Sequence, residues 1–298
     1  MTGPTSESEI APWVRQLGLP GLVDLHVHFL PEEVMHKVWA YFDRAEQHYG
    51  TAWPVHYRTS EPARLAALRS FEVRRFAPLV YPHKPDMAEW LNRWALEFAD
   101  REPDAVPTAT LYPEPSAESY VGAALRAGAR CFKAHVQVGA YDPRDELLDA
   151  VWGALADAGV PVVVHCGNGP IPGDYTGLDV FAEVLRRHPN LVAVLAHAGM
   201  PEYEAALRLV HAHSRVYLDT TMVGTAFSER FAGLPADWAS RLVPIADRVA
   251  LGTDFPNIPY SYDTQLRAIA GWADADERLG DGFLRAVLHD TPAKLLGV

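Results

Sequence analysis

Short apolar runs alternate with longer segments of helical spacing along the whole chain. Eight of these runs are predicted to be β-strands: Leu22–His28, Val73–Tyr81, Ala105–Tyr112, Arg130–Val136, Val160–Cys166, Leu191–His197, Arg215–Thr220 and Arg248–Asp254. After the first unit a new strand begins every 24–33 residues, which is the length of one strand, one helix and two loops. Near-continuous apolar strands indicate a parallel sheet covered on both faces.

Eight such units predict an α/β fold, namely a closed (β/α)8 TIM barrel over residues 1–298 as a single domain. A doubly wound open sheet is the alternative. Helices are expected at 85–99 and at 143–158, the latter with Asp142 as N-cap and Gly159 as C-cap.

The interval between the first two strands is exceptionally long. Residues 29–72 form a 44-residue insertion rich in Trp, Tyr and Phe. In a barrel this insertion leaves from the rim where active sites are built, so it fits a lid or a pocket wall. A pair of helices packed against the barrel, with the aromatic residues as their own small core, is an equal alternative.

Composition limits the partners. The chain has 26 Lys and Arg against 38 Asp and Glu, a net charge of −12, which argues against nucleic acid or an anionic membrane as the partner. We expect a small-molecule substrate, with a homodimer left open as the assembly. The start of the sequence has no apolar signal segment, so the expected location is the cytoplasm. Two cysteines, Cys131 and Cys166, are expected to be buried thiols rather than a disulfide framework.

Two His-X-His tripeptides occur, His26–His28 and His211–His213, and the motif alone is weak evidence. With 13 histidines in 298 residues, random placement gives roughly 0.6 such pairs. The two tripeptides differ in their place in the predicted secondary structure. The first pair closes a predicted strand, whose period of two points both imidazoles to one face, above Asp24. The second follows a helical segment, and we interpret it as a surface feature without function.

Three more polar residues close predicted strands. They are His165 on the fifth, His197 on the sixth and Asp254 on the eighth, and the ends of barrel strands are where catalytic groups lie. Any one of them could simply cap a helix or bind a loop carbonyl. Together with His26 and His28 they supply the neutral imidazoles and carboxylate that suit a divalent cation such as Zn²⁺. The sequence therefore predicts a catalytic metal site.

Four segments carry a resemblance to a known family. Residues 23–28 (VDLHVH), 162–167 (VVVHCG), 195–199 (LAHAG) and 251–256 (LGTDFP) resemble, in order and spacing, those of the amidohydrolase superfamily. The similar branch is that of amidohydrolase-related metal-dependent hydrolases, which also contains aminocarboxymuconate semialdehyde decarboxylase. The resemblance implies that His26, His28, His165 and Asp254 bind one metal. It further implies that Asp254 serves as base and that His197 contacts the reacting water or substrate.

Lys133 and His135 lie on one face of the fourth predicted strand, as candidates for substrate or second-metal binding. In relatives with two metals, a carbamylated lysine from this strand bridges them. We expect an unmodified Lys133 and one metal per chain, with Zn²⁺ favoured over Mn²⁺ or Fe²⁺.

Such a centre predicts a hydrolase that uses a metal-bound hydroxide to cleave the C–N or C–O bond of an amide, lactone or ester. Non-oxidative decarboxylation of an unsaturated or aromatic carboxylate is the alternative reaction. It is kept open by the aromatic insertion and by four basic residues that could pair with a carboxylate: Arg44, Arg58, Lys84 and Lys133.

Overall fold

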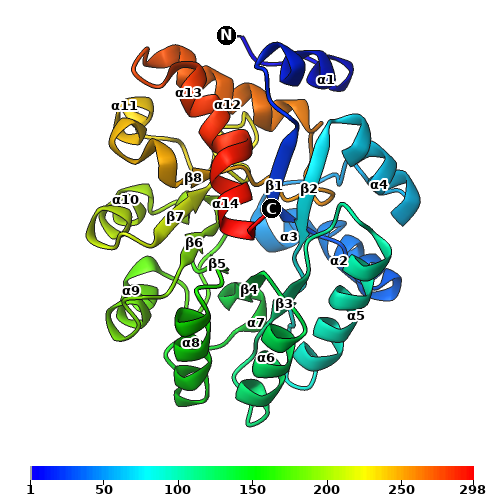
Figure 1. The fold of residues 1–298 in the computed structure, drawn as a ribbon, viewed down its shortest axis with the longest axis vertical. Helices are drawn as coiled ribbons and strands as arrows, with labels where there is room; N and C mark the ends of the chain where they lie inside the picture. Colours follow the sequence, from blue (N-terminus) through cyan, green and yellow to red (C-terminus); the bar gives the residue numbers. More distant parts are fainter. Residues whose placement is uncertain (1) are drawn as a thin grey trace. The chain divides into compact units, whose positions relative to one another are not determined.

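A computed structural model describes residues 2–298 and confirms a strand within each of the eight predicted runs (Figure 1). The strands are β1 (Leu22–Val27), β2 (Val73–Pro78), β3 (Thr108–Thr110), β4 (Cys131–His135), β5 (Val162–His165), β6 (Ala193–Leu195), β7 (Val216–Asp219) and β8 (Val249–Ala250). Most of them are shorter than expected. His197 and Asp254, which were predicted to end strands, lie in turns beyond them.

Longer helices separate the strands. They are α1 (Glu7–Gln16), α2 (Glu32–Phe42), α3 (Ala45–Tyr49), α4 (Glu61–Ser70), α5 (Ala88–Arg101), α6 (Ala117–Arg126), α7 (Val136–Gly139), α8 (Glu146–Ala158), α9 (Leu178–Arg187), α10 (Tyr203–Ala212), α11 (Trp238–Leu242), α12 (Asp263–Ala275), α13 (Gly280–Arg285) and α14 (Thr291–Leu296). None of the helices in residues 2–298 combines the length and hydrophobicity that crossing a bilayer requires.

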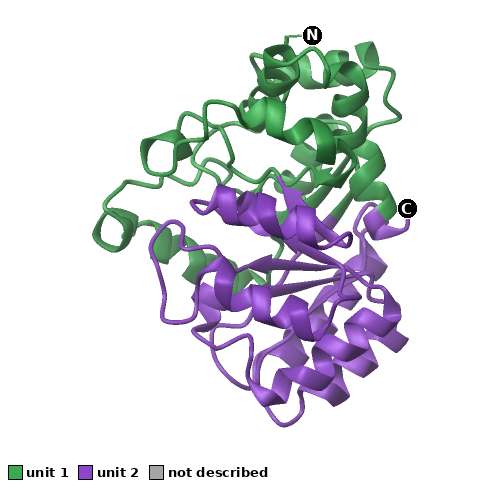
Figure 2. Ribbon diagram, turned by 90° about the vertical axis from the view of Figure 1, so that its left-hand side faces the viewer, with its two compact units in different colours: residues 1–76, 220–294, 298 green, residues 77–219, 295–297 purple. Residues whose placement is uncertain are grey.

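The chain forms two compact units (Figure 2). Unit 1 contains the residues up to Phe76, residues 220–294 and Val298, and unit 2 contains residues 77–219 and 295–297. Unit 1 therefore holds β1, β2 and β8 with the insertion 29–72, and unit 2 holds β3 to β7.

In unit 2 the five strands β3 to β7 are hydrogen-bonded parallel neighbours in sequence order, as expected of successive β-α units. Helices α5, α6, α8, α9 and α10 flank this sheet (Figure 1). The register pairs His135 of β4 with His165 of β5, so two predicted site residues end adjacent strands at the same level. Both cysteines are buried free thiols in this unit, as expected.

In unit 1, β1 pairs with β2 and also borders the segment that follows β8. The backbone N–H of Leu25 donates to the carbonyl of Leu251 at 2.9 Å, and that of His28 donates to the carbonyl of Phe255 at 2.7 Å. All six residues of β1 are buried. The polar side chains of this strand are therefore shielded from bulk water.

The predicted starts of both helices are wrong, since α5 begins at Ala88 and not at residue 85. Helix α8 begins at Glu146, and its N-cap is Asp145, whose side chain accepts the backbone N–H of Leu147 at 2.9 Å. Asp142, the predicted cap, instead accepts hydrogen bonds from Arg144, which hold a turn before the helix. The C-cap is Gly159, as expected, with a left-handed φ of 64°.

Candidate metal centre

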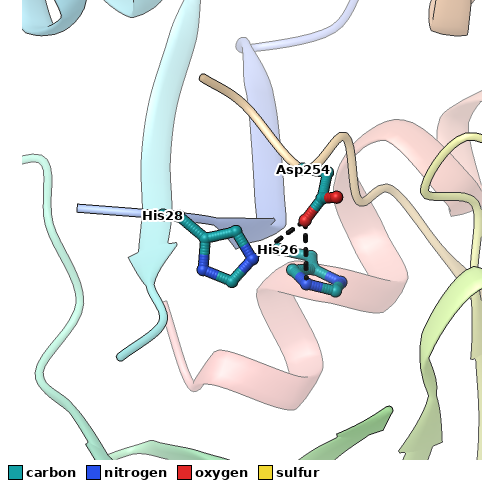
Figure 3. A group of neighbouring side chains, drawn as sticks. All are labelled: His26, His28 and Asp254. Atoms are coloured by element: carbon teal, nitrogen blue, oxygen red, sulfur yellow. Dashed lines mark ion pairs between the residues drawn. The ribbon is translucent and has the colours of Figure 1, made fainter. Parts of the chain in front are cut away.

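Three predicted ligands meet in unit 1. Oδ1 of Asp254 lies 2.8 Å from Nε2 of His28 and 3.4 Å from Nε2 of His26 (Figure 3). The two imidazole rings are 5.1 Å apart and nearly perpendicular, and each points its Nε2 at the same carboxylate oxygen. Both histidines are buried. The strand period of β1 thus places both rings on one face, as predicted.

Asp254 reaches this position through an unusual backbone conformation. Its φ is +66°, in the left-handed region, and it lies four residues beyond the end of β8 rather than at the end of an extended strand. Its backbone N–H donates to the carbonyl of His26 at 2.8 Å. A non-glycine residue keeps such a conformation only where its surroundings fix it, and here β1 does so. The strand was predicted too long because a sequence pattern does not show this turn.

Thr221 sets the orientation of the His26 ring. Its Oγ1 lies 3.1 Å from Nδ1 of His26, and the threonine is fully buried. If Nδ1 carries the proton and donates it to this hydroxyl oxygen, Nε2 keeps its lone pair for a metal, the arrangement typical of histidine ligands. Thr221 follows β7 and was missed by the sequence analysis.

Asp24 holds the backbone beneath the histidines. Its Oδ1 accepts the backbone N–H of His26 at 3.1 Å, and its Oδ2 accepts the hydroxyls of Thr253 at 2.6 Å and Tyr262 at 2.8 Å. Burial, and then the neighbouring Asp24 carboxylate, raise the pKa of Tyr262, so this hydroxyl stays a donor. Asp24 therefore joins β1 to the residues on both sides of Asp254.

The donor set fits a divalent cation. One ligand atom from each of His26, His28 and Asp254 can be chosen so that all lie within 4.8 Å of one another. Two neutral imidazole nitrogens and a carboxylate oxygen are typical ligands of Zn²⁺ and of related first-row metals. Three protein ligands also leave positions for water or substrate.

In unit 2 the other predicted site residues form a row of aromatic rings. The rings of His135 and His165 stack at 4.2 Å with an angle of 15° between them, and the His197 ring lies 4.7 Å from that of His165. Tyr81 extends the row, with its ring 4.9 Å from His135. Unit 2 therefore brings together His135, His165 and His197, which the sequence placed on the fourth, fifth and sixth predicted strands. Lys133, two residues before His135, is fully buried.

Hydrogen bonds indicate how the protons are placed on two of these rings. Nε2 of His165 lies 3.0 Å from the carbonyl oxygen of Gly169, which can only accept, so Nε2 carries a proton and the lone pair of the neutral ring is on Nδ1. On His135, Nδ1 accepts the backbone N–H of Val138 at 3.3 Å, which places the proton on Nε2. A metal bound by His165 in this ring orientation would use Nδ1.

His197 lies two residues beyond the end of β6, in a turn with a φ of +56°, and not at the end of an extended strand as predicted. The next residue, Ala198, is also left-handed, with a φ of +48°. The buried carboxylate of Asp219, at the end of β7, accepts the backbone N–H of His197 at 2.8 Å. Asp219 thus holds this turn, and no local sequence signal indicated its role.

The insertion 29–72 packs its aromatic residues against other loops of unit 1. A buried cluster of Ala45, Trp53 and Met222 is surrounded by Phe42, Tyr49, Val55, Phe227 and Tyr260. Of these, Met222 and Phe227 follow β7, and Tyr260 follows β8. The aromatic core is therefore shared between the insertion and the loops that border the candidate ligands.

The sequence and the fold both resemble known proteins. The sequence matches the family model described as amidohydrolase over residues 23–298. No curated protein matches it at a significant level. The structure resembles an uncharacterized TIM-barrel protein from Bordetella bronchiseptica, with a TM-score of 0.72 and 17% identity over 93% of this chain and 98% of that one. This likeness confirms the predicted TIM-barrel fold.

Two further solved structures share the fold and contain metals. An amidohydrolase from Burkholderia multivorans with bound zinc has a TM-score of 0.62 and 16% identity, over 93% of this chain and 99% of that one. A 5-carboxyvanillate decarboxylase from Novosphingobium aromaticivorans, in complex with manganese and 4-hydroxy-3-methoxy-5-nitrobenzoic acid, has a TM-score of 0.59 and 14% identity, over 93% and 96%.

Proposed function

Because the chain belongs to the amidohydrolase family, we propose that it is an enzyme that hydrolyses a small molecule with the help of one divalent cation. The observation that carries the proposal is the convergence of two buried histidines, His26 and His28, with the half-buried Asp254. We assign His165 as a further ligand and Zn²⁺ as the preferred metal, with Mn²⁺ or Fe²⁺ as alternatives. The zinc and manganese in the two structural relatives support a divalent cation.

The chemistry divides between the metal and the side chains. A bound divalent cation lowers the pKa of water and so supplies a nucleophile at neutral pH. Asp254 offers a carboxylate oxygen that can accept a proton from this nucleophile as general base. We assign His197 the task of contacting the substrate oxygen and moving a proton to or from it, since an imidazole can exchange a proton near neutral pH. Lys133 and His135 remain candidates for binding the substrate.

The bond that is cleaved is a C–N or C–O bond of an amide, lactone or ester. Hydrolysis is favoured because an activated water is first a nucleophile toward a carbonyl carbon. The alternative is non-oxidative decarboxylation of an unsaturated or aromatic carboxylate, and the likeness to 5-carboxyvanillate decarboxylase is the observation in its favour.

Turnover in ¹⁸O-labelled water separates the two reactions. In hydrolysis the oxygen of water enters the product, so the new carboxylate must carry the label. In decarboxylation one equivalent of carbon dioxide leaves instead. We expect labelled carboxylate and no gas when lactones, amides and unsaturated or aromatic carboxylates are screened. Stoichiometric carbon dioxide at a kcat above about 1 s⁻¹, the low end for enzymes, would establish the alternative.

A further inference from the structure

Two tryptophans of the insertion contact the chain just beyond Asp254. We propose that the insertion 29–72 acts as a fixed support that positions Asp254, through hydrogen bonds from Trp39 and Trp53 to Asn257. This inference rests on the proposed role of Asp254 as a metal ligand. It assigns the insertion a task in metal binding that neither a lid nor an independent helix pair would have.

Asn257 receives one hydrogen bond from each indole. Nε1 of Trp39 donates to the side-chain Oδ1 of Asn257 at 3.2 Å, and Nε1 of Trp53 donates to its backbone carbonyl at 2.7 Å. All three residues are buried, with 2% of Asn257, 5% of Trp39 and 7% of Trp53 exposed. Because water does not reach these buried groups, each indole N–H needs an acceptor within the protein. The two hydrogen bonds therefore hold Asn257 from two directions.

Asn257 is in turn joined directly to Asp254. Its backbone N–H donates to the carbonyl of Asp254 at 2.9 Å, which closes the turn that contains the ligand. One residue further on, the carbonyl of Ile258 accepts the backbone N–H of His56, another residue of the insertion, at 2.8 Å. The segment that carries Asp254 is therefore bonded to the chain of His26 and His28 up to Phe255, and to the insertion from Asn257 onward.

The left-handed backbone of Asp254 explains why such support is needed. A φ of +66° is unfavourable for an aspartate and persists only where several contacts impose it. The hydrogen bonds to β1 fix the N-terminal side of this turn, and the two indoles fix its C-terminal side. With one side released, the turn could relax and move the carboxylate away from His26 and His28.

The two indoles are themselves held by packing. Trp53 contacts the ring of Phe42 at 5.2 Å and that of Phe227 at 4.7 Å. The guanidinium groups of Arg64 and Arg58 lie over the Trp39 ring, at 5.3 Å and 5.7 Å from its centre. Both rings therefore present their N–H groups from surroundings that restrict their movement.

The test removes each indole N–H while it keeps an aromatic ring. We would measure the Kd for Zn²⁺ and for Mn²⁺ of Trp39→Phe and Trp53→Phe by competition with a chromophoric chelator, together with the Tm of each variant. Each substitution is expected to weaken metal binding by about tenfold, the lower end for groups that position a ligand.

Two matched controls separate positioning from loss of bulk or of any hydrogen bond. Trp13→Phe alters a buried indole of unit 1 whose Nε1 has no hydrogen-bond partner within residues 2–298. Trp152→Phe removes an indole hydrogen bond in unit 2, the one to the carbonyl of Pro143 at 2.8 Å. Both controls should lower Tm by amounts similar to the test variants and leave Kd unchanged.

A double-mutant cycle supplies a readout that a merely structural role would not move. If Trp39 acts through Oδ1 of Asn257, then Trp39→Phe should weaken metal binding in the natural chain and add little in the Asn257→Ala background. Independent, additive effects on Kd would overturn the proposal, as would unchanged Kd values in both tryptophan variants while the natural chain binds metal. A natural chain that binds neither Zn²⁺ nor Mn²⁺ would instead overturn the proposed function, and this inference with it.

Discussion

The chain contains the same tripeptide pattern, His-X-His, in two places with different outcomes. His26 and His28 are buried, their rings lie 5.1 Å apart, and both face Asp254. His211 is exposed near the end of α10, and His213 follows the end of that helix, half-buried. The first pair lies at the end of a buried strand and the second at the end of a surface helix.

The difference lies in the backbone that carries the motif. In a strand, residues i and i+2 share a face, so two histidines at this spacing can aim at one point. At the end of a helix, residues i and i+2 do not face each other, and the pair cannot converge. A short metal-binding pattern therefore has meaning only together with the secondary structure beneath it.

Loss of one histidine of the buried pair should weaken metal binding most. His28→Ala removes a ligand nitrogen and should weaken binding of Zn²⁺ or Mn²⁺ by more than the roughly 100-fold that is the upper limit for positioning residues. His211→Ala, from the exposed pair, should leave the Kd unchanged. Both constants can be obtained by competition with a chelator. Equal Kd values for the two variants would mean that the buried pair does not bind the metal.

Two single histidines of unit 2, His165 and His197, are expected to differ from each other in their effect on metal binding. His165→Ala should lose metal and activity together, because His165 is assigned as a ligand. His197→Ala should keep the metal while kcat falls by about 10²–10⁴, the range for general acid–base groups. Metal content by elemental analysis and steady-state rates give both quantities. If His197→Ala loses the metal as completely as His165→Ala, then His197 is itself a ligand.

A smaller effect on metal binding is expected at Thr221, whose hydroxyl orients the ring of His26. Thr221→Val keeps the shape of the side chain but removes the oxygen 3.1 Å from Nδ1 of His26, and it should weaken metal binding by about 10–100-fold. Thr221→Ser retains the oxygen and should stay close to the natural Kd. The proposed role of Thr221 fails if valine and serine give the same affinity.

A variant that lowers only the stability of the fold should have the smallest effect on metal binding. Asp145→Ala removes the N-cap of α8 and should lower the free energy of unfolding by about 1 kcal/mol, measured by urea denaturation. The Kd for metal should not change, because α8 contributes no ligand. A weaker Kd in this variant would show that stability losses alone can imitate the effects expected at His28 and Thr221.

The regular parts of the fold could be predicted from the sequence. Apolar runs and their spacing located all eight strands, and the strand period placed His26 and His28 on one face. The same reasoning located His135 and His165, which the parallel register brings side by side. These features depend on near neighbours in sequence, which is why a pattern reveals them.

The irregular parts could not be predicted. Asp254 and His197 both have a left-handed backbone, which is uncommon for residues other than glycine, and in both the backbone N–H is bonded to a residue distant in sequence. Thr221 contacts a histidine 195 positions away, and Asn257 receives its bond from a tryptophan 218 positions away. Partners so distant in sequence leave no local signal. The start of α8 was misplaced for another reason, because Asp142 and Asp145 are both suitable N-cap residues by type.

The placement of the two cysteines has a practical consequence. Cys131 and Cys166 are the only cysteines of the chain, both lie in unit 2, and both are almost completely buried. Burial raises the pKa of the Cys131 thiol to about 12 and also raises that of Cys166, so neither forms a reactive thiolate in the native protein. Alkylation at neutral pH must therefore wait for unit 2 to open. The rate of alkylation would therefore measure the opening equilibrium of unit 2, the unit that also carries His165 and His197.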